Sequence, residues 1–90
     1  MTWFVCKVNS AGPGSGGSET TSPVIYINLT DQGGTFSGLW FYAAQDAKSE
    51  MLAVALNAIS LQATVQVNAP PPHPNNSPYT EITSLYLNAS

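Results

Sequence analysis

Residues 48–69, KSEMLAVALNAISLQATVQVNA, decide the fold that the sequence predicts. The longer first part is strongly apolar and predicts a helix, whereas the alternating valines near the end predict a strand over 63–69. Three strand-like runs lie before this segment and one lies after it. This order, with one helix between the third and fourth strands, predicts a mainly β (α+β) fold. We expect residues 1–90 to form a single domain, a five-stranded OB-fold barrel.

Runs of β-branched and aromatic residues place the remaining strands at 3–8, 24–30, 35–43 and 80–88. Between the first two runs, the glycine- and serine-rich stretch 9–23 predicts a loop or an extension of the first strand. Residues 31–34, DQGG, predict a hairpin turn, because glycine readily takes a positive φ. Five prolines within 70–78 predict an extended loop that cannot pair as a central strand.

The helix is expected to begin at Asp46, a typical N-cap residue, and to bury one stripe of side chains at helical spacing. This stripe consists of Leu52, Ala55, Leu56 and Ile59, and it is widened by Met51, Val54 and Ala58. A helix this apolar needs cover on more than one side, and so does the strand segment 39–42, LWFY, which places large groups on both faces. We therefore expect a homo-oligomer, with cover by the chain's own loops as the alternative for 39–42. The expected interface contains Trp40, Tyr42, Met51, Val54 and Ala58.

The charge content of the chain argues against several classes of partner. Only 8% of the residues are charged, the net charge is −3, and Lys7 and Lys48 are the only basic residues. Two lysines cannot build the basic groove that single-stranded nucleic acid requires, so nucleic-acid binding is not expected. No apolar run approaches the roughly 20 residues of a membrane span. One cysteine cannot form an intrachain disulfide, and with one histidine it offers too few ligands for a metal, so no metal or cofactor is expected.

Catalytic chemistry is not expected either, because no set of titratable residues has a catalytic spacing. Cys6 lies in an apolar strand and is interpreted as a core residue, and His73 is interpreted as a solvated loop residue. The remaining hydroxyl, amide and aromatic side chains suit carbohydrate, since sugar faces stack on aromatic rings while sugar hydroxyls form hydrogen bonds. The candidate ligand-binding residues are Ser10, Asn75, Asn76, Ser77 and Tyr79. The alternative is that these aromatic residues belong to the core or an interface, and that the polar residues only keep the loops in water.

Residues 48–52, KSEML, the apolar helix after them, and residues 64–67, TVQV, resemble part of a known family. They are similar to the helix-to-fourth-strand segment of pentameric B subunits of AB-type bacterial toxins, such as the subtilase cytotoxin and pertussis-like B subunits. The resemblance implies an OB-fold subunit in a ring of five, with helices lining a central pore, which binds host glycans and partners a toxin A subunit. It also implies secretion, although no signal peptide precedes the first strand. The alternative function is a structural or protein-interaction ring that binds no sugar.

Overall fold

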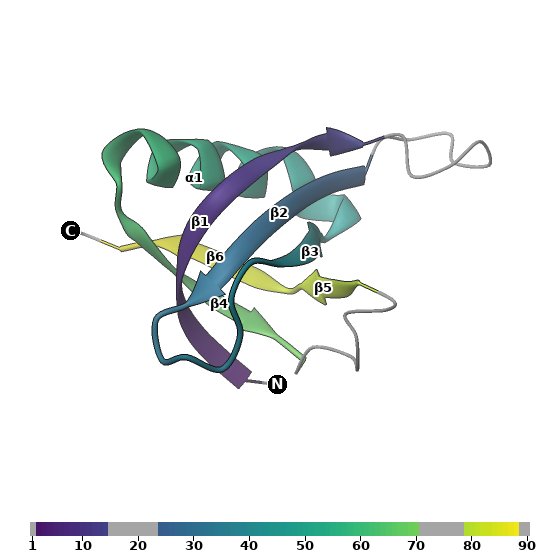
Figure 1. Ribbon diagram of the computed structural model, residues 1–90. Helices are drawn as coiled ribbons and strands as arrows, with labels where there is room; N and C mark the ends of the chain where they lie inside the picture. Colours follow the sequence, from purple (N-terminus) through teal and green to yellow (C-terminus); the bar gives the residue numbers. More distant parts are fainter. Residues whose placement is uncertain (1, 15–23, 71–78, 89–90) are drawn as a thin grey trace.

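The computed structural model describes residues 2–14, 24–70 and 79–88, which form a curled sheet of six strands and one long helix (Figure 1). The strands are β1 (Thr2–Gly14), β2 (Val24–Asp31), β3 (Leu39–Ala43), β4 (Thr64–Ala69), β5 (Thr80–Ile82) and β6 (Ser84–Leu87). A short 3-10 turn, η1 (Gln45–Ala47), leads into the helix α1 (Lys48–Leu61). The mainly β class and the single helix between the third and fourth strands therefore agree with the prediction.

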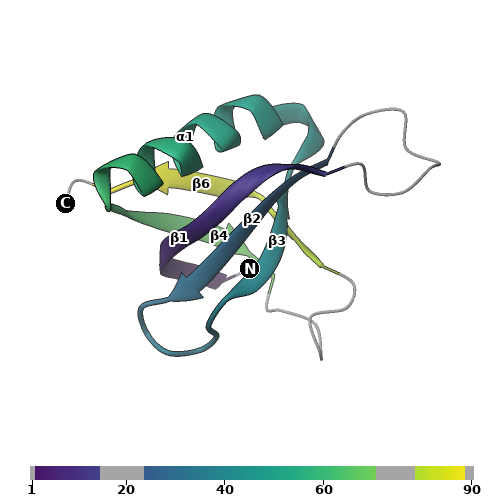
Figure 2. The same ribbon diagram turned by 45° about the horizontal axis from the view of Figure 1, so that its top comes forward.

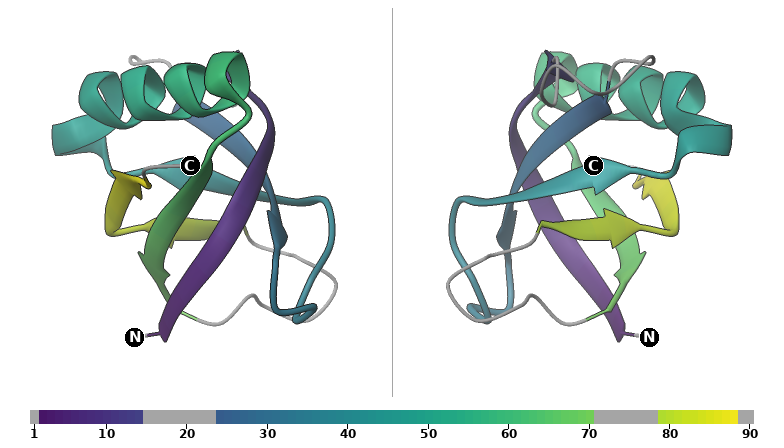
Figure 3. Two further views of the ribbon diagram at one scale, coloured as in Figure 1. Left: turned by 90° about the vertical axis from the view of Figure 1, so that its left-hand side faces the viewer. Right: turned by 90° about the vertical axis from the view of Figure 1, so that its right-hand side faces the viewer.

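The sheet has the order β5-β3-β2-β1-β4-β6, and all neighbours are antiparallel except β3 and β5, which are parallel. The strands β5 and β6 belong to opposite ends of this order, yet only Thr83 separates them along the chain. At this bend the backbone N–H and the hydroxyl of Thr83 both donate to the carbonyl of Asn68, at 2.9 and 2.7 Å. The segment expected as one strand over 80–88 is therefore two short strands. As a result, the sheet curls into a half-barrel (Figure 3).

The concave face of the sheet carries the core. In β1 the side chains of Phe4, Cys6 and Val8 alternate inward, as the β-branched and aromatic pattern requires. Isoleucine and leucine from β2 and valine from β4 meet them, and most of these side chains are fully buried. The interpretation of Cys6 as a core residue is confirmed, since its side chain is completely buried.

The connection between β2 and β3 is longer than the expected hairpin, so β3 begins at Leu39 rather than at residue 35. The carboxylate of Asp31 accepts hydrogen bonds from the backbone N–H groups of Gly33 and Thr35, at 3.1 and 3.0 Å. Beyond this turn the ring of Phe36 inserts into the core between Phe4 and Phe41, with both centroid distances at 5.2 Å. Burial of Phe36 pulls the connection inward, which is why these residues do not continue β3.

The first strand runs six residues beyond its expected end, through the glycine-rich segment to Gly14. Its pairing with β4 ends at Lys7, whereas its pairing with β2 continues to the end. Pro13 therefore lies where β1 has only one neighbouring strand, and there a missing N–H is tolerated. A β-bulge at Asn9 shifts the register between Val8 and Ser10.

The helix lies across one end of the curled sheet and contacts mainly β1, β6 and β2 (Figure 2). One expectation about it is wrong, and a second holds only in part. The N-cap is Ala47 rather than Asp46, because Asp46 is taken into the preceding 3-10 turn. The buried residues are Met51, Ala55 and Ala58, and the two alanines let the helix approach the sheet closely.

The expected stripe is therefore only partly correct, because two of its members lie at the surface. Ala55 is buried as expected and Leu52 is partly buried, but Leu56 and Ile59 are 49% and 38% exposed. Among the described residues, no helix combines the length and the apolar character needed to cross a membrane.

Candidate functional site

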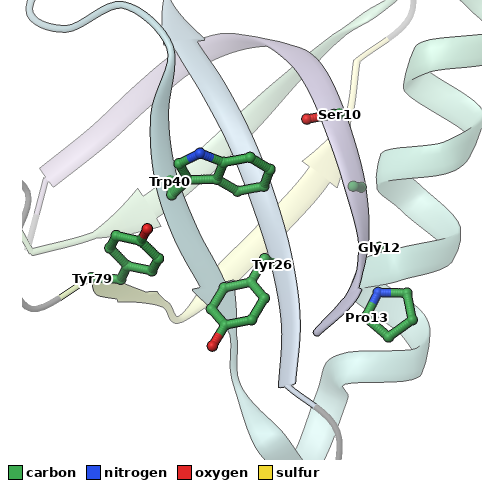
Figure 4. Close-up of a pocket in the computed structure, with 7 residues that line it drawn as sticks. Ser10, Gly12, Pro13, Tyr26, Trp40 and Tyr79 are labelled. Atoms are coloured by element: carbon green, nitrogen blue, oxygen red, sulfur yellow. The ribbon is translucent and has the colours of Figure 1, made fainter. Parts of the chain in front are cut away.

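A cavity of about 450 Å³ lies on the convex side of the three-stranded part of the sheet formed by β1, β2 and β3 (Figure 4). Its walls are Ser10, Ala11, Gly12, Pro13, Tyr26, Trp40 and Tyr79. Tyr79 is the residue directly before β5. The site therefore joins the face of the sheet to one edge of the half-barrel. We call this cavity the aromatic pocket.

Strand register explains why the aromatic pocket forms here. In β2 the side chains of Tyr26 and Asn28 point to the convex face, because Ile25, Ile27 and Leu29 point to the core. Opposite them on β1 stand small residues, with Gly12 beside Tyr26 and Ser10 beside Asn28. On the other side, β3 places Trp40 opposite Asn28. The small side chains of β1 therefore lie on one side of the pocket, and the large aromatic side chains lie on the other.

Two aromatic rings of the pocket meet edge to face, and the pocket remains accessible. Tyr26 and Tyr79 are T-shaped, with ring centroids 5.8 Å apart and planes at 87°. Trp40 is 36% exposed and Tyr79 is 41% exposed, and the indole of Trp40 extends from β3 over β2 (Figure 4). None of the seven lining residues carries a charge. Such a pocket offers apolar ring faces with a few hydroxyl groups, a combination that binds neutral amphiphilic ligands.

A network of amide and hydroxyl groups holds the strands next to the pocket. The side-chain amide of Asn9 donates to Asn28 Oδ1 and to Thr30 Oγ1, at 2.8 Å in both cases. Asn28 Nδ2 in turn donates to the carbonyl of Gly38 at 3.1 Å, and the N–H of Gly38 donates to Thr30 Oγ1 at 3.0 Å. The bulged residue of β1 is thus fixed to β2 and to the start of β3. These bonds set the separation between Ser10 and Trp40, which flank Asn28 on the neighbouring strands.

A second cavity of about 530 Å³ lies on the other side of the Tyr26–Tyr79 pair and shares both rings with the first. Its walls are Val24, Tyr26, Tyr42, Gln45, Pro70, Tyr79, Thr80 and Glu81. Parallel pairing of β3 with β5 brings Tyr42 beside Glu81. Gln45 Oε1 accepts a hydrogen bond from Lys48 Nζ at 3.3 Å, so an ammonium group lies just outside this cavity.

The titratable groups with shifted pKa values lie away from the aromatic pocket. Burial, reinforced by the nearby charge of Asp31, raises the pKa of the Cys6 thiol to about 12. A hydrogen bond from the Thr35 side chain, together with backbone N–H groups of Gly33 and Thr35, lowers the pKa of Asp31 although burial opposes this. Neither group lines the pocket. Within the described ranges, no three His, Cys, Asp or Glu side chains gather as metal ligands would.

The structure brings together two of the five residues proposed for ligand binding. Ser10 and Tyr79 line the same pocket although 69 positions separate them in the sequence. Asn75, Asn76 and Ser77, together with His73, lie outside the described residues. Tyr26, Gly12 and Pro13 were not anticipated. Only the outward position of Tyr26 in 24–30 signalled it, while the contribution of Gly12 and Pro13 depends on the extension of β1.

The residues proposed for an oligomer interface do not form one surface. Two of them line the cavities, one is partly buried and two are buried in the core. Trp40 lines the aromatic pocket and Tyr42 lines the second cavity. Val54 is partly buried and packs against the core. Met51 and Ala58, which were also expected to widen the core-facing stripe of the helix, are both buried against the protein's own sheet. The outward apolar residues of α1 are instead Leu56, Ile59 and Leu61.

Comparison of the chain with protein-family models, with curated proteins and with solved structures gives no significant match. The case for a function accordingly depends on the geometry of the site.

Proposed function

We propose that this chain is a non-catalytic binding domain and that its ligand is a carbohydrate held in the aromatic pocket. The observation that supports this most directly is an open, uncharged cavity with Trp40, Tyr26 and Tyr79 on one side and Ser10 on the other. The C–H faces of a sugar ring pack on aromatic rings, and the hydroxyl groups of the sugar exchange hydrogen bonds with Ser10 and the tyrosine hydroxyls. Glycine at position 12 leaves room for the ligand between β1 and the indole of Trp40.

For the fold, we propose that the half-barrel is an OB-fold in which β5 and β6 together serve as the fifth strand. The parallel pairing of β3 with β5 and the dual pairing of β1 with β2 and β4 support this assignment. The position of α1 between β3 and β4, across one end of the curled sheet, also supports it. In such folds ligands bind on the barrel face and at the loops beside it, which is where the aromatic pocket lies.

We also propose that the domain assembles as a homopentamer similar to the B subunits of AB-type toxins, with a host glycan as ligand and an A subunit as further partner. The exposed apolar residues Leu56, Ile59 and Leu61 on α1 support assembly, because contact with another subunit would remove their side chains from water. Light scattering on a size-exclusion column tests this directly. A mass of five protomers is the expected result, and a monomer at high concentration would contradict the ring.

The second candidate function is a structural or protein-interaction module that binds no sugar. One observation favours it, an exposed aromatic pair away from the pocket. Trp3 and Tyr86 stack at 5.7 Å and 20° on the outer side of the sheet, and both are more than half exposed. Large exposed aromatic groups of this kind are common at protein interfaces.

Saturation-transfer NMR with the methyl glycosides of glucose, galactose, mannose, fucose and N-acetylglucosamine tests sugar binding. Trp40→Ala is expected to weaken the affinity for the bound glycoside at least tenfold, which corresponds to about 1.4 kcal/mol. Trp3→Ala is the matched control, because it removes the other tryptophan without touching the pocket. Absence of binding to every glycoside at millimolar concentration would contradict carbohydrate binding and favour the interaction module.

A further inference from the structure

The aromatic pocket and the second cavity are neighbours that share two walls, Tyr26 and Tyr79. The two rings, which meet edge to face, separate the aromatic pocket from the second cavity. Each cavity alone falls within the roughly 300–1,000 Å³ typical of small-ligand sites. Together they offer more space than a single sugar unit fills.

Strand β3 supplies one large aromatic group to each cavity. Trp40 lines the first and Tyr42 lines the second, and the two residues are separated by one position on the strand. Residues i and i+2 of a strand point to the same face and lie about 7 Å apart along it. The two rings are therefore separate along the strand, so consecutive sugar units can each meet a different ring.

The two cavities differ in their polar groups. The polar side-chain groups of the aromatic pocket are hydroxyl groups and the indole N–H of Trp40, whereas the second cavity adds the amide of Gln45 and the carboxylate of Glu81. A carboxylate accepts hydrogen bonds from hydroxyl groups, and a side-chain amide both donates and accepts. The second cavity is therefore equipped to hold the hydroxyl groups of a second sugar unit and to fix its orientation.

We propose that the two cavities form one cleft for an extended carbohydrate of at least two sugar units. One unit packs against Trp40 and the next lies over Tyr42, with the Tyr26–Tyr79 pair at the linkage between them. Glu81 and Gln45 hold the hydroxyl groups of the second unit. This inference rests on the proposed carbohydrate function and deepens it, because it predicts that chain length determines affinity.

Titration calorimetry with three pairs of probes tests the two-unit cleft. The pairs are methyl β-glucoside with cellobiose, methyl β-galactoside with lactose, and N-acetylglucosamine with di-N-acetylchitobiose. In at least one pair the disaccharide is expected to bind tenfold or more tightly than the single sugar. Equal affinities within every pair that binds would overturn the two-unit cleft and leave carbohydrate binding intact. No binding by any probe would overturn both proposals.

Substitutions in the second cavity test where the second sugar unit binds. Tyr42→Ala is expected to remove the gain from the disaccharide while leaving the affinity for the single sugar unchanged. Trp40→Ala weakens both, and Trp3→Ala changes neither. Glu81→Ala provides a second variant should Tyr42→Ala fold poorly, and it is expected to reduce the same gain. A disaccharide gain that survives both Tyr42→Ala and Glu81→Ala would overturn the proposal.

A proline-rich peptide is the competing occupant, since aromatic grooves also bind polyproline segments. A decapeptide of proline is included as a probe in the same titrations. Binding of this peptide with no response to any of the six sugars would overturn the carbohydrate cleft.

Discussion

Replacing Gly14 by alanine is expected to destabilise the protein, whereas the same change at Gly12, earlier on the same strand, is expected to stabilise it. A Cβ atom added at Gly14 would lie 2.5 Å from Cε2 and 2.7 Å from Cδ2 of Tyr26. A Cβ atom added at Gly12 would have no neighbour within 4 Å. Neither glycine has a positive φ, so alanine is accessible to the backbone at both positions.

The difference in unfolding free energy between the two variants measures the cost of the overlap with Tyr26. The 2.5 Å approach is about 0.9 Å short of ordinary van der Waals contact at 3.4 Å, so the tyrosine ring must move. Overpacking of this kind costs about 1–3 kcal/mol. Replacing glycine within a strand by alanine gains about 0.5–1 kcal/mol in both variants, because it reduces the conformational freedom of the unfolded chain. Gly14→Ala is therefore expected to be about 1–3 kcal/mol less stable than Gly12→Ala.

Urea unfolding followed by circular dichroism measures this difference, and thermal unfolding provides a second measurement. For a domain of this size, each kcal/mol corresponds to a shift of about 4–8 °C in Tm. Equal stabilities of Gly12→Ala and Gly14→Ala would refute the reasoning, because Tyr26 would then not lie against Gly14. The shared wall of the two cavities would have to be placed elsewhere.

Three further predictions concern the core, the helix and the long turn. Because burial raises the pKa of Cys6 to about 12, iodoacetamide is expected to alkylate it only after denaturation, and mass spectrometry of native and urea-treated protein checks this. Met51→Ala is expected to cost about 2–5 kcal/mol, whereas Leu56→Ala is expected to change the stability of the dissociated protomer by less than about 0.5 kcal/mol; the reverse order in urea unfolding of the dissociated protein would contradict the burial of Met51 and the exposure of Leu56. Folding lowers the pKa of Asp31, so its stabilisation is present above the unfolded value of about 3.9 and is lost as the pH falls through the folded-state value. The stability difference between the wild type and Asp31→Asn should therefore shrink below about pH 4, and a pH-independent difference would contradict the hydrogen-bonded carboxylate.

Strand alternation in the sequence was a sound guide wherever one face is buried. Ile25, Ile27 and Leu29 were expected to share a face of the second strand, and they are buried together. The valines of the fourth strand behave in the same way. In both strands every second residue is apolar, and burial of that face leaves only one register that keeps polar residues in water.

The helix shows why apolar spacing alone could not identify the buried face. Nearly all sides of α1 are apolar, so several stripes at helical spacing compete. The structure buries the stripe that contains Ala55 and Ala58, because small side chains permit close approach to the sheet, and it leaves Leu56 and Ile59 outside. A leucine side chain gains more free energy from burial than an alanine side chain does. The short distance between the helix and the sheet nevertheless favours alanine at the buried positions.

The candidate site was predictable only in part, because it depends on contacts distant in the sequence. Ser10 and Tyr79 were identified by residue type, and the fold brings them to one pocket. Trp40 was expected at an interface because its strand has apolar groups on both faces. Its place in the pocket depends on the small residues of β1, which lie across β2 from it within a stretch whose composition is typical of a loop.

The bulge at Asn9 has a consequence for how the length of this chain can change. Odd-numbered residues face outward before the bulge, at Trp3, Val5 and Lys7, whereas after it Ser10 and Gly12 face outward. Deleting Asn9 would leave Val8 and Ser10 on their present partners in β2, and it would remove only the amide bonds of the bulge. Deleting one residue between Ser10 and Gly14 would instead exchange the two faces of the strand end. The alternation of side chains in this strand therefore survives loss of the bulge residue, whereas it does not survive loss of a residue beyond the bulge.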